Sequence, residues 1–348
     1  MTNRRFPRLL AGLALASALA MPAGAARAEN FQSEFDKVFG KAPRAPREVQ
    51  PTVRPFVSPV QPVTTYGGGL EATVANLANA AQGRIGVAAM DLGTGRTITV
   101  LGDQPFPMAS TSKIAITATY LDLVDQGKLK LSDKFPLMIP QRSARFSTRV
   151  APVRPGAMLT AQGLIELSIT RSDNPATDAL LAAVGGPAAV NRWLRKAGLS
   201  GMRLDRDIAT LVRDDGEFNP ATTVDPRDSA TPLAMVQLLA GLHEGRWLSS
   251  SSRDVLLGAM ARCLTGKRRL RAMLPTEARI AHKTGTLNNT SSDVGIIHTP
   301  DGRAIAIAVY VTGQGGKANR DYRIASISRA VYDGYLTESS SLRRTASR

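Results

Sequence analysis

The predicted strands of this chain fall into two groups that lie far apart in the sequence. The first group is 84–92 and 96–101, and the second is 279–285, 293–299 and 304–312. Between the groups, from Ser110 to about Gly266, apolar residues recur mostly at helical spacing. One helix is predicted before the first strand, at 70–83, and one after the last, at 323–336. Any fold for this chain must therefore join two distant groups of strands.

This order favours an α/β chain of the α+β type. The simplest packing is one five-stranded antiparallel sheet flanked by the N- and C-terminal helices, with an inserted all-helical subdomain at about 110–266. The globular domain would then span 70–337. A cleft between the sheet and the helical subdomain is a natural place for a ligand.

The first 28 residues have the composition of a cleavable signal peptide. A basic start with Arg4, Arg5 and Arg8 precedes the apolar run LLAGLALASALAMPAGA, and the small-residue site Ala26-Arg27-Ala28 follows. We therefore expect export, and a mature protein that is periplasmic or secreted.

Two further segments carry too little apolar surface to form a core. Residues 29–69 contain six prolines and end in three glycines, which predicts a disordered, Pro-rich linker. Residues 338–348 read ESSSLRRTASR, which predicts a disordered tail.

The chain is strongly basic, with a formal net charge of +16. We expect no nucleic-acid partner, because basic and aromatic residues do not interleave and no nucleic-acid-binding module is recognisable. The charge suits contact with an anionic cell envelope, although a solvated surface explains it more simply. Cys263 is the only cysteine, so an intrachain disulfide is impossible, and we expect it to be a buried small hydrophobe.

The stretch FPMASTSK places Ser110 at the start of a predicted helix and Lys113 in its first turn. A serine cap followed by an unimportant surface lysine would explain the pattern. However, a cation is unfavourable at a helix N-terminus, where the dipole is positive and lowers the pKa of an amine. One helical turn brings Lys113 next to Ser110, so the pair can act as base and nucleophile. The backbone N–H of Ser110 would be one oxyanion donor.

Two other stretches carry candidate groups, and each also has an ordinary structural explanation. Ser172, Asp173 and Asn174 precede Pro175, as at many helix starts. As functional groups, Ser172 would relay a proton to the leaving nitrogen and Asn174 would hold an amide of the substrate.

The second of these stretches, AHKTGT, lies at a predicted strand end. It could form a plain turn. Functionally, Lys283 and Thr284 would receive a carboxylate. Gly285 would allow close approach of the substrate, and the N–H of Thr286 would be the second oxyanion donor.

Together, in this order, the three stretches resemble the Ser-x-x-Lys, Ser-Asp-Asn and Lys-Thr-Gly motifs of class A β-lactamases and penicillin-binding proteins. From Leu70 to about Leu336 the chain is similar to the class A β-lactamases: RLDR resembles the start of their Ω-loop, and PRDSATPLAM resembles its end. The resemblance implies a serine hydrolase that opens β-lactam antibiotics through an acyl-enzyme. By the match of TGKRRLRAMLP, it also implies that Arg269 is a second cation near the substrate carboxylate.

The chain departs from the family in the Ω-loop. Family members carry Glu-x-Glu-Leu-Asn there, and the first glutamate activates the water that releases the acyl group. Here the loop is about seven residues longer, and DGEFN aligns with that motif when anchored on Asn219. This alignment makes Asp215 the candidate base and Glu217 the alternative, unless these acids are only solvated loop charges.

Two rival functions remain open from sequence. A penicillin-binding or DD-peptidase-like protein would share the acylation residues but release its acyl group slowly, with a cell-wall peptide as substrate. A non-catalytic wall-binding protein on the same scaffold ranks third, because Ser110, Lys113, Ser172 and Lys283 are all present. No metal or cofactor is expected, because no His, Cys and acid cluster has metal-ligand spacing. A monomer is the default expectation.

Overall fold

The computed structural model describes residues 54–55 and 69–346, and the side chains of 69–337. The predicted signal peptide and almost all of the predicted Pro-rich linker lie outside the described residues. Among the helices of the described part, none combines the length and the apolar character that a membrane crossing requires.

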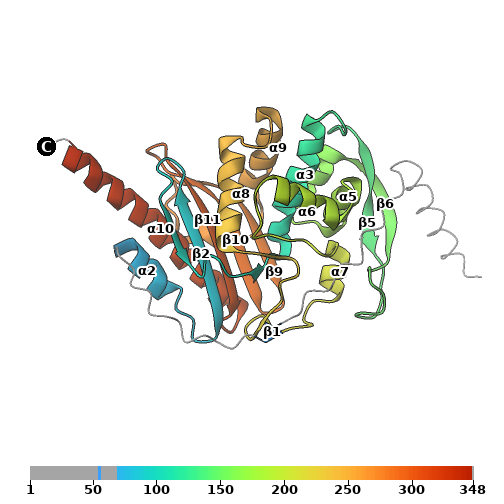
Figure 1. Cartoon of the computed structure of the whole chain (residues 1–348), viewed down its shortest axis with the longest axis horizontal. Helices are drawn as coiled ribbons and strands as arrows, with labels where there is room; N and C mark the ends of the chain where they lie inside the picture. Colours follow the sequence, from blue (N-terminus) through green and yellow to red (C-terminus); the bar gives the residue numbers. More distant parts are fainter. Residues whose placement is uncertain (1–53, 56–68, 347–348) are drawn as a thin grey trace, which may run out of the picture. The chain divides into compact units, whose positions relative to one another are not determined.

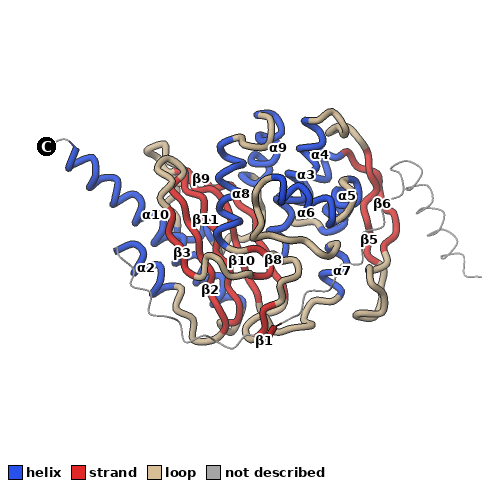
Figure 2. Tube along the Cα trace, in the orientation of Figure 1, coloured by secondary structure: helices blue, strands red, loops and turns tan. Residues whose placement is uncertain are grey.

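The five predicted strands form one antiparallel sheet, in the order β3-β2-β11-β10-β9 (Figures 1 and 2). The predicted fold class is therefore confirmed. The two distant groups of strands meet where β2 pairs with β11, with Val87 opposite Val309. Every residue of β11 is buried, because both faces of the sheet are covered. The strands are β2 (Gly83–Asp91), β3 (Thr97–Val100), β9 (Arg279–Leu287), β10 (Thr290–His298) and β11 (Ala304–Gly313).

Two helices, α2 (Gly69–Leu77) and α10 (Lys317–Ala346), cover one face of the sheet (Figure 1). Their apolar side chains, such as Val74 and Val331, pack with Ile307 of β11 in one buried cluster. Helix α10 ends at Ala346, whereas the sequence predicts its end at 336 and a disordered tail beyond it. The backbone continues as helix because neither glycine nor proline follows Gly334.

The other face is covered by the helical part, which encloses a second and larger apolar cluster. Helix α8 lies against β2 and β11. Helix α3 is buried at every position of its first nine residues, which is typical of a helix in the centre of a core. The helices of this part are α3 (Lys113–Asp125), α4 (Ala161–Thr170), α5 (Asn174–Ala183), α6 (Pro187–Lys196), α7 (Ile208–Arg213), α8 (Pro232–Glu244) and α9 (Ser250–Ala261), with the short 3₁₀ helices η1 (Ala109–Ser112) and η2 (Leu270–Met273).

The middle of the chain also contains strands, so it is not all-helical as expected. The longest pair forms a hairpin whose sequence carries Pro136, Pro140 and Pro155. Prolines at this density interrupt a helix but are tolerated in a two-stranded ribbon, where every strand has an outer edge. The additional strands are β5 (Lys134–Pro140) with β6 (Val153–Thr160), β4 (Phe106–Pro107) with β8 (Ser229–Ala230), and β1 (Arg54–Pro55) with β7 (Thr223–Val224).

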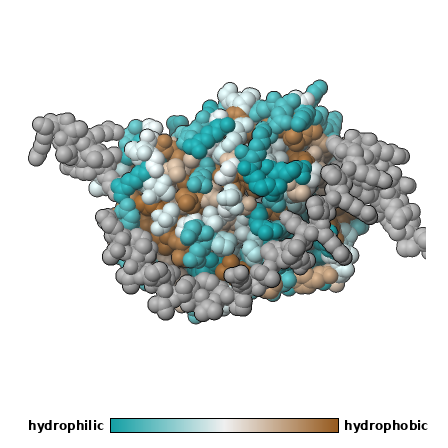
Figure 3. Space-filling view, viewed as in Figure 1, coloured by the Kyte–Doolittle hydropathy of each residue, from teal (hydrophilic) through white to brown (hydrophobic). Residues whose placement is uncertain are grey.

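On the face drawn in Figure 3, hydrophilic residues gather over the helical part around α6, with smaller hydrophobic patches between them. Helix α6 carries Arg192, Arg195 and Lys196 on its sequence. This distribution agrees with a solvated basic surface.

Candidate active site

Ser110 lies in the 3₁₀ turn η1, and Lys113 is the first residue of α3. The preceding residue, Ala109, has a positive φ of 48°, a conformation that a non-glycine residue rarely adopts. The hydroxyls of Thr111 and Ser112 donate to the backbone oxygens of Met108 and Ala109, both at 2.8 Å, and so hold the turn. Ser110 is left to line a surface pocket with Ser172, Asn174, Thr284 and Thr286.

Gly285 of β9 lets this turn approach the sheet. A Cβ at this position would lie 2.7 Å from the backbone oxygen of Met108 and 2.4 Å from the Oγ of Ser292, so any side chain would force the turn away. The glycine therefore allows η1 to pack against β9, so that Ser110 and Thr286 line the same pocket; the sequence predicts a different role for Gly285, the close approach of substrate.

The Lys113 side chain is fully buried and crosses from α3 to the loop before α5. Its Nζ donates to the Oδ1 of Asn174 and to the backbone oxygen of Ser172, both at 2.7 Å, and to the Ser172 Oγ at 3.3 Å. Burial lowers the pKa of Lys113 well below its usual value, and the nearby Lys283 ammonium lowers it further. The amine can therefore lose its proton and act as a base.

Ser172 lies between the two lysines, because the Lys283 Nζ donates to its Oγ at 2.9 Å. Ser172 also has a positive φ, of 59°. The next residue, Asp173, caps α5 by accepting from the N–H of Ala176 at 2.8 Å. Since Asp173 is the cap, the side chain of Asn174 is available to Lys113. The helix-start explanation is met by Asp173, and the functional roles of Ser172 and Asn174 stay predictions.

Arg269 forms the far wall of the pocket. It is 3% exposed, and its guanidinium donates to the Thr286 Oγ1 and the backbone oxygen of Gly285, both at 2.7 Å. Asp321 of α10 holds the guanidinium through its Nε at 2.7 Å. Burial lowers the pKa of Lys283 to about 8. Thr284, Thr286 and Arg269 thus form a cationic, hydroxyl-lined end of the pocket that suits a carboxylate, with Lys283 buried next to it in β9.

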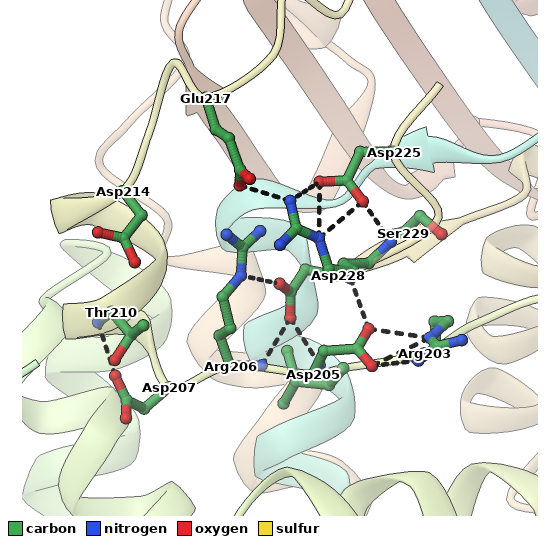
Figure 4. Close-up of polar contacts among 12 residues, drawn as sticks. Arg203, Asp205, Arg206, Asp207, Thr210, Asp214, Glu217, Asp225, Asp228 and Ser229 are labelled. Carbon is green, nitrogen blue, oxygen red and sulfur yellow. Dashed lines mark hydrogen bonds and ion pairs between the residues drawn. The ribbon is translucent and has the colours of Figure 1, made fainter. Parts of the chain in front are cut away.

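The ends of the predicted Ω-loop are joined by one ion pair and by hydrogen bonds between Asp205 and Asp228 (Figure 4). The Arg206 Nε lies 2.6 Å from Oδ2 of Asp228, whose other oxygen accepts the N–H of Asp205 at 2.7 Å. Arg203 in turn donates to Asp205, with an Nε to Oδ2 distance of 2.9 Å. These contacts close the loop at its base.

The structure does not bring the two candidate bases to the pocket of Ser110. The Asp215 carboxylate accepts the N–H of Asn288 at 2.8 Å, and Glu217 pairs with Arg227 at 2.5 Å (Figure 4). Both acids line a different pocket, which includes Phe218 and Asn288. The alignment anchored on Asn219 therefore selects residues on the outer part of the loop.

The first turn of α7 occupies the inner part of the loop. Anchoring the family motif on Leu211 instead places Ile208 opposite the first glutamate, so no carboxylate stands at that position. The buried acid nearby is Asp178 of α5, whose oxygens accept the N–H groups of Ile208 and Ala209 at 2.7 and 2.8 Å. Burial raises the pKa of Asp178 to about 7. Asp178 was not predicted as a site residue. An acidic residue one turn after Asn174 in an otherwise apolar helix could have indicated a buried, hydrogen-bonded carboxylate there.

Comparison with known proteins agrees with this geometry. A family model described as the beta-lactamase enzyme family matches residues 69–335. Beta-lactamase CTX-M-8 from Citrobacter amalonaticus is 32% identical over 278 residues, which are 79% of this chain and 92% of the relative. Beta-lactamase CTX-M-25 from Escherichia coli is 31% identical over 277 residues, with the same two shares of 79% and 92%.

Solved structures give the same result. An ancestral class A β-lactamase has 38% identity and a TM-score of 0.67, over 76% of this chain and 99% of that one. A β-lactamase from Chitinophaga pinensis has 31% identity and a TM-score of 0.67, over 77% of this chain and all of that one. With the family model, the relatives and the fold in agreement, this chain belongs to the class A serine β-lactamase family.

Proposed function

We propose that this protein opens β-lactam rings through an acyl-enzyme on Ser110. The observation that carries the proposal is that Ser172 lines the same pocket as Ser110 and accepts hydrogen bonds from the buried Lys113 and Lys283 behind it. The relatives are β-lactamases, which supports the same reaction class.

In the acylation step, the Ser110 Oγ attacks the β-lactam carbonyl carbon while Lys113 accepts the hydroxyl proton. The N–H groups of Ser110 and Thr286 stabilise the oxyanion. When the ring C–N bond breaks, Ser172 delivers a proton to the nitrogen and is reprotonated by a neighbouring lysine. The bond to Ser172 from each lysine supports this relay.

Substrate recognition uses the rest of the pocket. Lys283, Thr284 and Arg269 bind the carboxylate. The Thr286 hydroxyl, which accepts a hydrogen bond from Arg269, lies at the edge of this carboxylate-binding end of the pocket. The Asn174 Oδ1 is occupied by Lys113, so its Nδ2 remains to donate to the amide carbonyl of the substrate side chain.

We infer that hydrolysis of the acyl-enzyme is slow. The acids of the loop are engaged elsewhere: Asp215 with Asn288, Glu217 with Arg227, and Asp228 with Arg206. Among the described residues, the hydrogen bonds of Lys113 go to a hydroxyl, an amide and backbone oxygens rather than to a carboxylate. In this proposal, water therefore attacks the ester with Lys113 as its base.

We further propose that the protein acts in the periplasm or outside the cell, as the signal-peptide composition of residues 1–28 indicates, and that it acts as a monomer. Hydrolysis of antibiotics there would contribute to resistance.

The experiment is intact-protein mass spectrometry with a penicillin, followed from seconds to hours beside assay of the opened product. We expect an adduct that accumulates in seconds and decays slowly while product forms. Ser110→Ala should give no adduct and should keep the circular dichroism spectrum of the wild type. An adduct on the folded Ser110→Ala protein would refute Ser110 as the nucleophile.

A second function is favoured by the absence of a carboxylate at Ile208. A protein with this site could act on cell-wall peptides and be trapped by β-lactams. Release of D-alanine from a D-alanyl-D-alanine peptide, together with an adduct that lasts for hours without opened product, would move this function to first place.

A further inference from the structure

Behind the carboxylate end of the pocket, a buried Cys263, His282 and Asp293 form a cluster that the proposed reaction does not use. Their side chains are 3%, 1% and 0% exposed. His282 and Thr284 lie on one face of β9, and Lys283 lies on the other, because neighbouring strand residues point to opposite faces. Within the described residues no three His, Cys or acidic side chains are arranged to hold a metal ion.

Only one ring nitrogen of His282, Nδ1, has a well-formed hydrogen bond in the described part of the chain. Its Nδ1 lies 2.9 and 3.0 Å from the two oxygens of Asp293. Its other nitrogen, Nε2, is buried and has no well-formed hydrogen bond among the described residues. A buried polar atom in that state is costly and therefore unusual. The thiol of Cys263 is the neighbour that interacts with this imidazole, by weak hydrogen bonding and by charge.

This arrangement activates the thiol. Burial alone would raise the pKa of Cys263, but His282 and, to a smaller extent, Thr265 outweigh burial and lower the pKa to about 7. Burial likewise opposes the charge on His282, but Asp293 and the thiol raise the pKa of His282 to about 10. A thiolate beside an imidazolium ion is the reactive form of cysteine.

The thiol is joined to the pocket by a chain of side-chain contacts. The Cys263 Sγ lies 3.3 Å from the Thr265 Oγ1, which lies 2.7 Å from the Thr284 Oγ1. Thr265 and Thr284 both line the pocket of Ser110. A change at the sulfur would therefore move the hydroxyl that is proposed to bind the substrate carboxylate.

Cys263 also lines a second hollow, on the outside of the molecule. Three arginines and the α4 residues Glu166, Leu167 and Thr170 surround this hollow; the arginines are Arg171, Arg262 and Arg271. Because Cys263 is only 3% exposed, small reagents alone can reach the sulfur.

We propose that Cys263 is a redox-modification site, at which a small peroxide oxidises the thiolate and weakens substrate binding at Thr284. The Cys263 thiolate attacks one oxygen of hydrogen peroxide, an S–O bond forms, and the O–O bond breaks to release hydroxide, which takes up a proton to become water. The sulfur is oxidised to the sulfenic acid and the peroxide is reduced. Two equivalents of a thiol reductant restore the cysteine, with formation of a disulfide and water.

The new oxygen enters a buried site, so the Thr265 hydroxyl has to move and its bond to Thr284 is lost. We expect a roughly three- to tenfold rise in KM for a penicillin, the effect of about one hydrogen bond. This second part of the inference rests on the proposed function, whereas the oxidation itself does not.

The first experiment measures the thiol alone, in the full chain. After exposure to hydrogen peroxide, the protein is unfolded in denaturant with a maleimide, and the labelled fraction reports how much Cys263 is still reduced. A parallel sample unfolded with dimedone identifies the sulfenic acid and distinguishes it from oxidised methionine. We expect oxidation of Cys263 at pH 7 to be faster than that of free cysteine, and dithiothreitol to reverse it. Loss no faster than that of free cysteine would overturn the proposal.

The pH profile of this reaction tests the role of the imidazole without any variant. We expect the rate to reach half its maximum near pH 7, against about 8.5 for an ordinary thiol. A half-point at about 8.5 or above would refute activation by His282.

The charged groups around the thiol are His282, Asp293, Lys283 and Arg269 towards the sheet, and Glu166, Arg171, Arg262 and Arg271 towards the outer hollow. His282→Gln, if its circular dichroism is native, should move the half-point upwards; an unchanged half-point would also refute the activation.

The link to the pocket is tested by the change in KM on oxidation. Cys263→Ser should show no change after peroxide, which controls for the ten methionines of the chain. Thr265→Val should still be oxidised at Cys263, but its KM before and after oxidation should be equal. A rise in KM that Cys263→Ser shares would refute the link and leave the oxidation result intact. Failure of the proposed function would instead appear as absent turnover with normal thiol chemistry.

Discussion

At the scale of single residues, the site contains two buried lysines for which we propose different roles. Lys113 and Lys283 both donate to Ser172 and both have a lowered pKa, chiefly because they are buried. Lys113 also donates to the Asn174 Oδ1 and to the backbone oxygens of Ser172 and Asp173, whereas Lys283 donates to the backbone oxygen of Thr284. In the proposed reaction, these different positions make Lys113 the base and Lys283 an anion-binding group.

Substrate binding should weaken as pH rises through the pKa of Lys283. The pKa is lowered to about 8, so the ammonium is present below pH 8 and lost above it. One unit above the pKa, about a tenth of the cation remains, so KM for a penicillin should rise about tenfold between pH 7 and 9. Steady-state kinetics across this range gives the measurement, and the methyl ester of the same penicillin is the control, with a flat KM. A flat KM for the acid as well would contradict the assignment.

Removal of the charge from either outer-loop acid should not trap the acyl-enzyme. Asp215 binds Asn288 and Glu217 binds Arg227, away from the pocket of Ser110. We expect Asp215→Asn and Glu217→Gln to change the lifetime of the penicillin adduct by less than about twofold, because neither acid touches the ester. Time-resolved intact-mass spectra measure this lifetime. A lifetime that grows about a hundredfold in one variant would identify that acid as the base.

At the scale of elements, β9 organises the site through its two faces. Lys283 and Gly285 face Ser172 and the turn of Ser110, whereas His282 and Thr284 face the segment after α9. A one-residue shift in register would exchange these faces and remove every group from its partner. Pairing with β10 along the whole strand keeps the register in place.

The Ω-loop depends on the pairs at its base. Arg206→Ala would leave the Asp228 carboxylate, which is 2% exposed, without its cation. We expect a loss of about 3 kcal/mol in the free energy of unfolding, the usual result of leaving one partner of a buried ion pair. Urea denaturation measures it. The control is Arg262→Ala, whose pair with Glu166 is exposed and should contribute less than about 1 kcal/mol. Equal losses in both variants would contradict this view of the loop.

At the scale of the whole molecule, the sheet is shared by two apolar clusters. Leu239 of α8 belongs to the cluster under the helical part, and Ile307 of β11 belongs to the cluster under α2 and α10. Since both clusters rest on the same strands, we expect the described domain to unfold in one transition.

Leu239→Ala and Ile307→Ala should each lower the free energy of unfolding by about 2–5 kcal/mol, because both side chains are fully buried. Calorimetry should show one transition, shifted to lower temperature, in each variant. Val212→Ala is the control, since Val212 is 50% exposed and should have little effect. A second transition in either core variant would show that the two clusters unfold separately.

The five-stranded sheet and its two covering helices could be predicted from the sequence, and so could the motifs that carry Ser110, Ser172 and Thr284, which line one pocket, and the lysines that contact Ser172. This was possible for the site because these groups belong to short motifs whose spacing defines a local turn or strand end. The hairpin of β5 and β6 was not predicted. Its prolines indicate that a helix is interrupted there, but they do not indicate that a hairpin forms instead.

The positions of the Ω-loop acids follow from the packing of the folded chain and could not be predicted from the sequence. The order of residues in the Ω-loop allows two alignments, and the packing of Ile208 and Ala209 against Asp178 distinguishes them from the outer position of Asp215 and Glu217. The same holds for Cys263, which the sequence presents as a lone hydrophobe and the fold sets beside His282. Such pairs form through contacts between distant segments, and nothing in the local spacing of a chain encodes them.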